Sequence, residues 1–308
     1  MGLSPFSLGE GSTPLVRATR LSAELGCELH LKCDGLNPTG SFKDRGMVLA
    51  VERAHAAGAH AVVCASTGNT AASAAAYAAR AGLEAVVLTP AGATAGPKRA
   101  QARAVGARVI EVRGTFDDAL RLCRELGQRE GFVLVNSLNP DRVEGQKSIA
   151  AELIDQLGRV PDIVALPFGG GGNVSAVAAG FADLGAAPRL IVGEAAERPT
   201  TWASAIRIGE PAHAEHVATL VGSARVEVLS LSEHELADAW QAVARTEGVF
   251  CEPASAAGVA ALKRVGSLDG LVAVAILTGH GLKDPDAVAD GAQEVVEPTV
   301  EAVLAVLG

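Results

Sequence analysis

Short apolar runs alternate with longer amphipathic segments along most of the chain, and this alternation predicts strands that alternate with helices. The expected strands cover residues 29–33, 61–65, 84–89, 108–112, 132–135, 163–166, 190–193, 226–229 and 272–277. The expected helices cover residues 42–57, 71–81, 97–105, 116–130 and 146–157, and three more follow Asn173, Ser232 and Ala254. This order is typical of an α/β protein with a parallel, doubly wound sheet. Residues 200–223 are weakly patterned, and we expect an irregular segment there.

Composition narrows the possible functions. The 308 residues suit two modest domains or one large one, and 49% hydrophobic residues suffice for a full core. The net charge of −9 argues against nucleic acid or a membrane surface as a partner. Residues 1–20 contain no secretory signal, and polar residues interrupt the apolar stretch 61–90, which therefore does not resemble a transmembrane helix.

The five cysteines are scattered and odd in number, and none is part of a Cys-x-x-Cys pair. This usage is unlike a disulfide framework or a metal site. We expect buried, reduced thiols in a cytoplasmic protein and no bound metal.

A turn rich in proline and glycine precedes the helix expected at 42–57. Its sequence is Pro38-Thr39-Gly40-Ser41-Phe42-Lys43-Asp44-Arg45-Gly46. Ser41 is a candidate N-cap, and Lys43 then falls in the first helical turn. Backbone N–H groups are unpaired there and the helix dipole is positive, so we expect a lowered pKa for the amine of Lys43.

Three further polar or glycine-rich segments follow predicted strands, at the ends where α/β proteins bind ligands. They are Ala65-Ser66-Thr67-Gly68-Asn69-Thr70, Pro167-Phe168-Gly169-Gly170-Gly171-Gly172-Asn173 and Leu277-Thr278-Gly279-His280-Gly281-Leu282-Lys283-Asp284. Taken alone, the first and third are ordinary turns at strand ends. The four glycines can turn backbone N–H groups inward at a helix start, which favours an anion cradle over a hinge.

These segments together resemble fold-type II pyridoxal-phosphate enzymes, and the form Ser41-Phe42-Lys43-Asp44-Arg45-Gly46 is most similar to the threonine synthase family. The resemblance runs from Gly11 to Asp284, with the motifs in the expected order. It implies two doubly wound α/β domains of the tryptophan synthase β type. The larger domain would comprise residues 1–44 plus 143–308, and the smaller, inserted domain residues 45–142.

The resemblance also assigns cofactor contacts. Lys43 would be the catalytic lysine that binds pyridoxal 5'-phosphate as a Schiff base, and Asn69 would donate to the phenolic oxygen of the ring. Thr278 would meet the pyridine nitrogen. The cofactor phosphate would lie in the cradle formed by Gly169, Gly170, Gly171, Gly172 and Asn173. The family usually carries asparagine near Gly170, so this loop lacks one side-chain donor.

Substrate contacts follow from the same resemblance. Ser66, Thr67 and Thr70 would bind the carboxylate or phosphate of the substrate. Asn136, Ser137 and Arg142, in a polar stretch after the strand at 132–135, would bind the phosphate of O-phospho-L-homoserine. The implied reaction converts this substrate and water to L-threonine and phosphate. A cytoplasmic homodimer without a metal is expected.

Two alternatives remain open at this point. One keeps the cofactor and changes the reaction, as in a serine or threonine dehydratase or a β-replacing synthase acting on phosphoserine or an O-acyl serine. The other is a non-catalytic binding protein of this fold that lacks the cofactor. The string Glu252-Pro253-Ala254-Ser255-Ala256-Ala257 is also typical of the family, and we interpret it as structural support.

Overall fold

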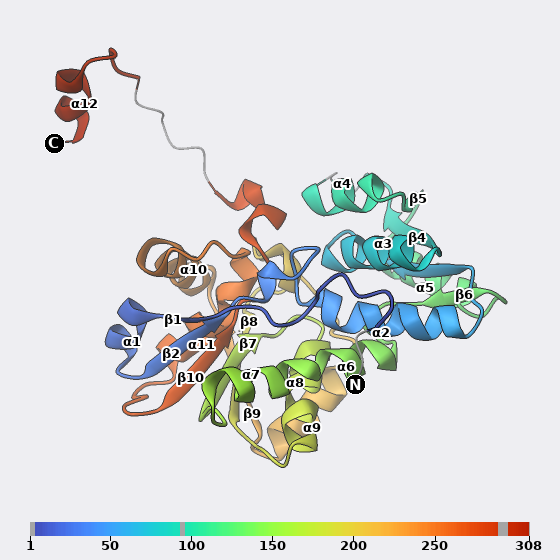
Figure 1. Cartoon of the computed structure of the whole chain (residues 1–308), viewed down its shortest axis with the longest axis horizontal. Coiled ribbons are helices and arrows are strands. Elements are labelled where there is room, and N and C mark those ends of the chain that lie inside the picture. The colour runs from blue at the N-terminus through green and yellow to red at the C-terminus, as the bar shows by residue number, and fades with distance from the viewer. Residues whose placement is uncertain (1–3, 93–95, 289–294, 308) are drawn as a thin grey trace.

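The computed structural model describes residues 4–92, 96–288 and 295–307. It contains two sheets, each with its own helices (Figure 1). The larger sheet has the strand order β1-β2-β10-β7-β8-β9, and only β1 runs antiparallel to its neighbour. Its strands are β1 (Leu15–Arg17), β2 (Glu28–Lys32), β7 (Ile163–Pro167), β8 (Arg189–Ala195), β9 (Val226–Leu231) and β10 (Val272–Ile276).

Helices cover both faces of the larger sheet. In the central strand β7, Ile163 and Ala165 belong to one apolar core, whereas Val164 and Leu166 belong to another. The helices of the first core are α1 (Thr19–Leu25), α10 (Glu233–Glu247) and α11 (Ala257–Arg264), and those of the second are α7 (Ser148–Leu157), α8 (Gly172–Asp183) and α9 (Ala214–Gly222). Burial on both faces explains why the strand appears in the sequence as an unbroken apolar run.

The smaller sheet is entirely parallel and has the strand order β5-β4-β3-β6. Its strands are β3 (Ala61–Ala65), β4 (Glu84–Pro90), β5 (Arg108–Val112) and β6 (Phe132–Leu134). One face packs on α2 (Lys43–Ala56), α3 (Asn69–Ala81) and α4 (Pro97–Ala104), and the other on α5 (Phe116–Leu126). All four strands lie inside the segment 45–142. The limits of the inserted domain stay a prediction.

The structure corrects several details of the predicted elements. The N-cap of α2 is Phe42 rather than Ser41, and no side chain caps this helix. The polar stretch after β6 contains a helix, α6 (Pro140–Gln146), and the weakly patterned segment 200–223 contains α9. Helix α5 ends at Leu126, four residues earlier than expected. The remaining elements are α12 (Val300–Leu307) and the short 3-10 helices η1 (Asp34–Leu36), η2 (Ser204–Ile206), η3 (Pro253–Ala256), η4 (Gly281–Lys283) and η5 (Pro285–Ala287).

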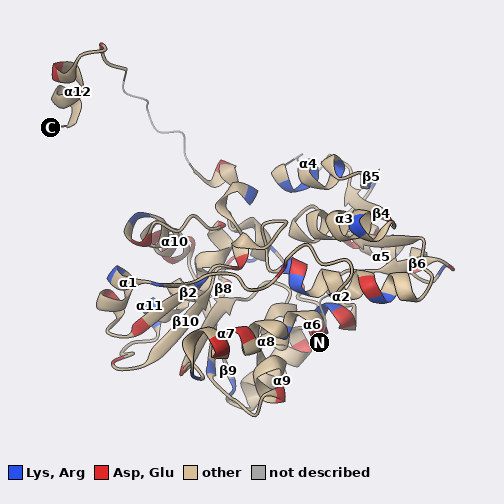
Figure 2. Ribbon diagram, in the orientation of Figure 1, with Lys and Arg blue, Asp and Glu red and all other residues tan. Residues whose placement is uncertain are grey.

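The surface and the cysteines agree with the composition. Basic and acidic residues are interspersed over the helices of both sheets (Figure 2). All five cysteines are buried and free, as predicted. Among the residues described, each helix is too short or too polar to cross a bilayer.

Candidate active site

The lysine turn is held against the loop after β10 by backbone hydrogen bonds. Phe42 N–H donates to the Thr278 carbonyl oxygen at 2.9 Å, and His280 N–H donates to the Gly40 carbonyl oxygen at 3.0 Å. Ser41 and Gly279 form an isolated antiparallel bridge. Two segments more than two hundred residues apart in the chain are thereby brought together, as the shared strand-end position predicts.

Lys43 is the first residue of α2 and is half-buried. Its Nζ lies 4.2 Å from the centre of the Phe42 ring, and it has no hydrogen bond or ion pair to any residue that the structure describes. Burial, reinforced by the charge of Arg142, lowers the pKa of Lys43 to about 7, while Glu252 opposes the shift. The pKa is lowered, as expected, and these contributions come from burial and from residues distant in the sequence.

The two residues after Lys43 anchor its helix. Asp44 accepts hydrogen bonds from Thr39 Oγ1 at 2.7 Å and Ser73 Oγ at 2.6 Å. Arg45 pairs with Asp34 at 2.8 Å and with Glu152 at 2.7 Å. Asp44 is thus hydrogen-bonded and Arg45 is ion-paired, and these buried contacts hold the lysine backbone in place. Sequence reasoning assigned neither residue a role, although both flank Lys43 in the same motif.

Arg142 reaches the lysine region because α2 and α6 cross at two glycines. A Cβ on Gly46 would lie 2.2 Å from the Arg142 carbonyl oxygen, and one on Gly145 would lie 2.4 Å from the Arg45 carbonyl oxygen. No larger residue fits at either position without moving the backbone. The crossing therefore fixes Arg142 beside the start of α2.

Arg142 is a buried cation, with 1% of the residue exposed. Nη1 donates to the Val135 carbonyl oxygen at 2.8 Å, while Nε has no partner among the described residues. No described carboxylate forms an ion pair with it, and burial lowers its pKa to about 10. An uncompensated buried cation suits an anionic ligand, and the planar guanidinium suits a phosphate.

Asn136 and Ser137, which precede Arg142 in the chain, make different contacts. The side-chain amide of Asn136 exchanges two hydrogen bonds of 2.9 Å with the backbone of Ala65, so it ties β6 to β3. The carbonyl oxygen of Ser137 accepts a 2.8 Å hydrogen bond from His213 Nε2. His213, which sequence reasoning missed, also donates its backbone N–H to Gly170 at 3.0 Å. It lies in the segment expected to be irregular, where no pattern could single it out.

The loop after β3 opens α3. Asn69, its first helical residue, is 7% exposed. Its Nδ2 donates to Glu252 Oε2 at 2.8 Å, and its Oδ1 is buried without a partner among the described residues. Ser66 Oγ accepts from the backbone N–H groups of Gly68 at 3.0 Å and Ala71 at 3.3 Å, so it caps the turn. Thr67 is exposed and Thr70 is half-buried.

The glycine loop after β7 ends at the first residue of α8. Gly171 has φ +85, and a Cβ there would lie 3.0 Å from His213 Cβ. The side-chain Nδ2 of Asn173 is buried without a partner in the described chain. The start of a twelve-residue helix and an unsatisfied buried donor therefore coincide, as expected of an anion cradle.

Thr278 lies two residues after the end of β10 and is 7% exposed. Its hydroxyl is 3.1 Å from Ser255 Oγ, which also accepts a 2.9 Å hydrogen bond from Gly279 N–H. Ser255 belongs to η3 and comes from the string interpreted above as structural support. A serine hydroxyl therefore positions the threonine predicted to meet the cofactor ring.

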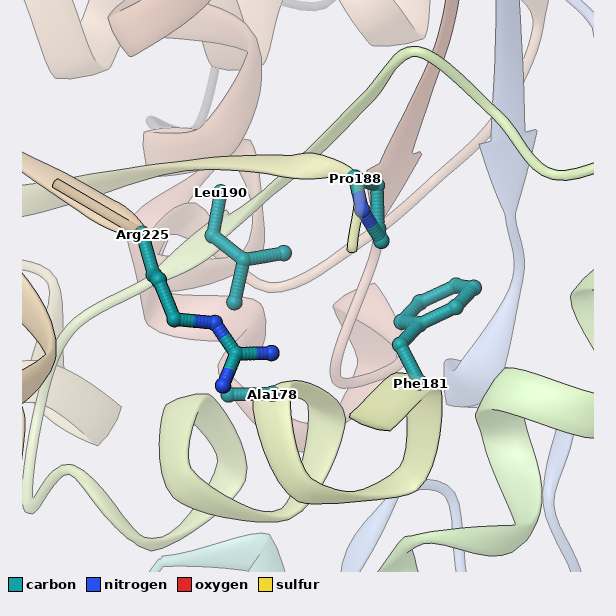
Figure 3. Close-up of a pocket in the computed structure, with 5 residues that line it drawn as sticks. All are labelled: Ala178, Phe181, Pro188, Leu190 and Arg225. Atoms are coloured by element: carbon teal, nitrogen blue, oxygen red, sulfur yellow. The ribbon is translucent and has the colours of Figure 1, made fainter. Parts of the chain in front are cut away.

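Figure 3 shows a small apolar hollow in the larger-sheet part of the chain. It is lined by Ala178, Phe181, Pro188, Leu190 and Arg225. These residues lie in the later part of α8 and at the amino ends of β8 and β9, whereas the candidate site is at the carboxyl ends of the strands.

The residues present fit a pyridoxal-phosphate cofactor. Lys43 offers an amine without a partner in the described chain, the glycine loop opens the N-terminus of α8, and Asn69 and Asn173 each carry an unsatisfied buried polar atom. An arrangement of lysine, asparagine and anion cradle on this fold defines a pyridoxal-phosphate enzyme.

Comparison with known proteins supports that class. The model of the family described as pyridoxal-phosphate dependent enzyme matches residues 6–279, and the chain belongs to this family. Its cofactor is pyridoxal phosphate. Solved structures of an O-ureido-L-serine synthase and of cysteine synthase from Entamoeba histolytica share its fold-type II architecture, each with a TM-score of 0.80. The O-ureido-L-serine synthase is 22% identical, with 100% of this chain and 98% of that chain covered. The cysteine synthase is 20% identical, with 95% of this chain and 93% of that chain covered.

Within the family, the chain groups with the threonine synthases. It is 46% identical to threonine synthase from Mycobacterium tuberculosis (strain ATCC 25618 / H37Rv), with 92% of this chain and 85% of that protein covered. It is 45% identical to the enzyme from Mycobacterium leprae (strain TN), with 98% and 90% covered. The corresponding protein of Methanocaldococcus jannaschii is 44% identical, with 94% and 80% covered.

Proposed function

We propose that this protein is a threonine synthase, a carbon–oxygen lyase that converts O-phospho-L-homoserine and water to L-threonine and phosphate. The observation that carries the substrate assignment is Arg142, a buried guanidinium without a carboxylate partner in the described chain. The 44–46% identity to curated threonine synthases supports the reaction.

Lys43 has two tasks in this proposal. Its amine attaches the cofactor covalently, and once released it takes the proton from Cα of the substrate. The pKa of about 7 leaves a large unprotonated fraction of this amine at neutral pH. Bound pyridoxal phosphate supplies the electron sink for bond cleavage at Cα and Cβ.

The other cofactor contacts follow from position. Asn69 would donate to the ring oxygen and Thr278 would meet the ring nitrogen, with a neutral hydroxyl partner that leaves the nitrogen short of full protonation. Gly169, Gly170, Gly171, Gly172 and Asn173 would hold the cofactor phosphate at the start of α8.

Substrate binding is assigned to the other polar residues of the site. Arg142 would neutralise the substrate phosphate and thereby make it a better leaving group at Cγ. Ser137 and Asn136 would adjoin it, with Asn136 bonded to Ala65 and acting mainly through the backbone it holds. Ser66, Thr67 and Thr70 would bind the carboxylate or the phosphate of the substrate. Water then adds at Cβ to complete threonine.

We also infer that the protein is a cytoplasmic homodimer. Within each protomer, residues near 45–142 would form the inserted domain. Five buried, free thiols suit a reducing compartment. Size-exclusion chromatography with light scattering tests the dimer, and a monomeric mass at micromolar concentration would rule it out.

The test of the reaction is to incubate the holo-protein with O-phospho-L-homoserine and assay inorganic phosphate and the amino-acid product together. Phosphate and threonine in equal amounts are expected. A yellow protein that releases no phosphate from this substrate but acts on phosphoserine, serine or threonine would overturn the proposal in favour of a β-eliminating or β-replacing enzyme.

A further inference from the structure

Glu252 is a buried carboxylate, with 1% of the residue exposed, and the reaction proposed above gives it no task. It directly precedes η3, and its backbone N–H donates to the Gly279 carbonyl oxygen at 2.9 Å. Burying a carboxylate costs free energy unless partners compensate its charge. What this side chain contacts therefore indicates why it is there.

Its two oxygens meet two residues from the smaller-sheet part of the chain. Oε2 accepts the 2.8 Å hydrogen bond from Asn69 Nδ2. Oε1 lies 2.6 Å from Nζ of Lys98, a buried lysine of α4 whose Nζ is also 3.2 Å from Ser204 Oγ. The carboxylate thus links an amide at the start of α3 to a counter-charge on α4.

The contact decides which way the Asn69 amide faces. A carboxylate only accepts hydrogen bonds, so the nitrogen of the amide must point toward Glu252. That nitrogen carries two N–H groups, and one remains for a ligand. The other amide atom, Oδ1, is buried and has no hydrogen-bond partner within the described residues. No described neighbour of Oδ1 therefore favours the flipped orientation of the amide.

The glycine after Thr278 provides an independent observation. A Cβ on Gly279 would lie 1.8 Å from Glu252 Oε2. Gly279 does not have a positive φ, so the need for glycine here is space rather than backbone conformation. The loop that carries Thr278 therefore passes so close to this carboxylate that a residue with a Cβ at position 279 would clash with it.

We propose that Glu252 is a positioning residue for the cofactor. It orients the side-chain amide of Asn69 so that the second N–H faces the ring oxygen, and Lys98 supplies the counter-charge that lets the carboxylate stay in the interior. This inference rests on the cofactor role proposed for Asn69. It does not depend on which substrate the enzyme uses.

The test compares the full-length holo-proteins of the wild type, Glu252→Gln and Glu252→Leu without substrate. The readouts are the rate of cofactor loss on dilution and the position of the visible absorbance band. We expect Glu252→Leu to release the cofactor about tenfold faster and to shift the band, since it removes a hydrogen bond to a charged group. Glu252→Gln keeps an acceptor for Asn69 and should have a smaller effect on both. The control Glu111→Gln removes an ion pair to Arg99 at 3.4 Å and should alter neither.

A double-mutant cycle separates positioning from general stabilisation. Asn69→Leu should shift the band like Glu252→Leu, and the double variant should show no further change. Unchanged cofactor release and absorbance in Glu252→Leu, or effects that add in the double variant, would overturn the proposal. If Glu252→Leu fails to fold by circular dichroism, the cycle is run with Glu252→Ala, which also removes the acceptor for Asn69. Absence of threonine formation would contradict the proposed reaction but would leave these readouts intact.

Discussion

The positive charge of Arg142 acts on the amine of Lys43 and, after the larger effect of burial, helps to lower the pKa of Lys43 to about 7. Neither side chain forms an ion pair with a described carboxylate. Arg142 thus has two roles in the proposed reaction: its charge favours the unprotonated amine of Lys43, and its guanidinium is available for the substrate phosphate.

The first prediction concerns the pH dependence of the cofactor-free protein. A lysine in an unfolded chain has a pKa near 10.5, whereas the pKa of Lys43 in the folded protein is about 7. Between these values the unfolded state binds more protons, so Lys43 makes the free energy of unfolding rise with pH above about 7. The contribution is at most about 1.4 kcal/mol per pH unit, and less here because the side chain is half-buried.

Urea unfolding at pH 7, 8 and 9 checks this for the wild type and Lys43→Met. The variant should lack part of the rise, while Lys283, with its pKa lowered to about 8 by burial, contributes in both proteins. Equal pH slopes for the two proteins would show that Lys43 titrates as an ordinary lysine.

The second prediction concerns covalent attachment of the cofactor. Lys43→Ala should yield a protein without the yellow lysine-bound cofactor and without product formation. Borohydride reduction followed by peptide mass mapping should find the cofactor on Lys43 in the wild type and on no lysine in the variant. The buried Lys98 and Lys283 are the rival positions, and an adduct on either in the wild type would contradict the assignment.

The third prediction separates binding from stability at Arg142. Arg142→Met should raise the KM for O-phospho-L-homoserine by an amount worth about 2–5 kcal/mol, because the substrate phosphate loses its buried partner. The free energy of unfolding should change by only about 1 kcal/mol, since one hydrogen bond is lost while an uncompensated buried charge is removed.

Steady-state kinetics and urea titration measure both effects. Arg99→Met is a matched control, because Arg99 is also a buried arginine but pairs with Glu111 at 3.4 Å. It should leave the KM unchanged. If Arg142→Met leaves the KM unchanged as well, the substrate phosphate binds elsewhere.

The fourth prediction concerns the anion cradle. Gly171→Ala should destabilise the protein by about 1–2 kcal/mol, because alanine is strained at φ +85. The new Cβ would also press on His213, 3.0 Å away, and should weaken cofactor binding. Gly209→Ala is the control, since its Cβ would point into open space. Thermal unfolding measures the loss of stability, and cofactor titration measures the loss of affinity. Equal stability and equal cofactor affinity of the two variants would show that the glycine loop does not bind the cofactor.

Local patterns predicted much of the fold because they follow from local physics. The strand β3 and the helix α4 are visible in the sequence as a buried apolar run and as an amphipathic segment that starts with proline. The predictions that were wrong failed because local patterns do not include tertiary contacts. Helix α6 is short and polar, and it is stabilised by its glycine crossing with α2 rather than by an apolar stripe. Ser41 has the chemistry of an N-cap, yet its hydroxyl is buried without a partner among the described residues.

The sequence by itself determined the α/β alternation, the lysine turn and the three strand-end segments, because turn chemistry and strand burial depend on neighbouring residues. Only the tertiary structure decided how these parts act on one another. The lowered pKa of Lys43 arises from burial and from Arg142, nearly one hundred residues away in the chain. The partner that orients Asn69 is Glu252, separated by 183 positions. Electrostatic and hydrogen-bond partners depend on distance in space, which the order of residues does not contain.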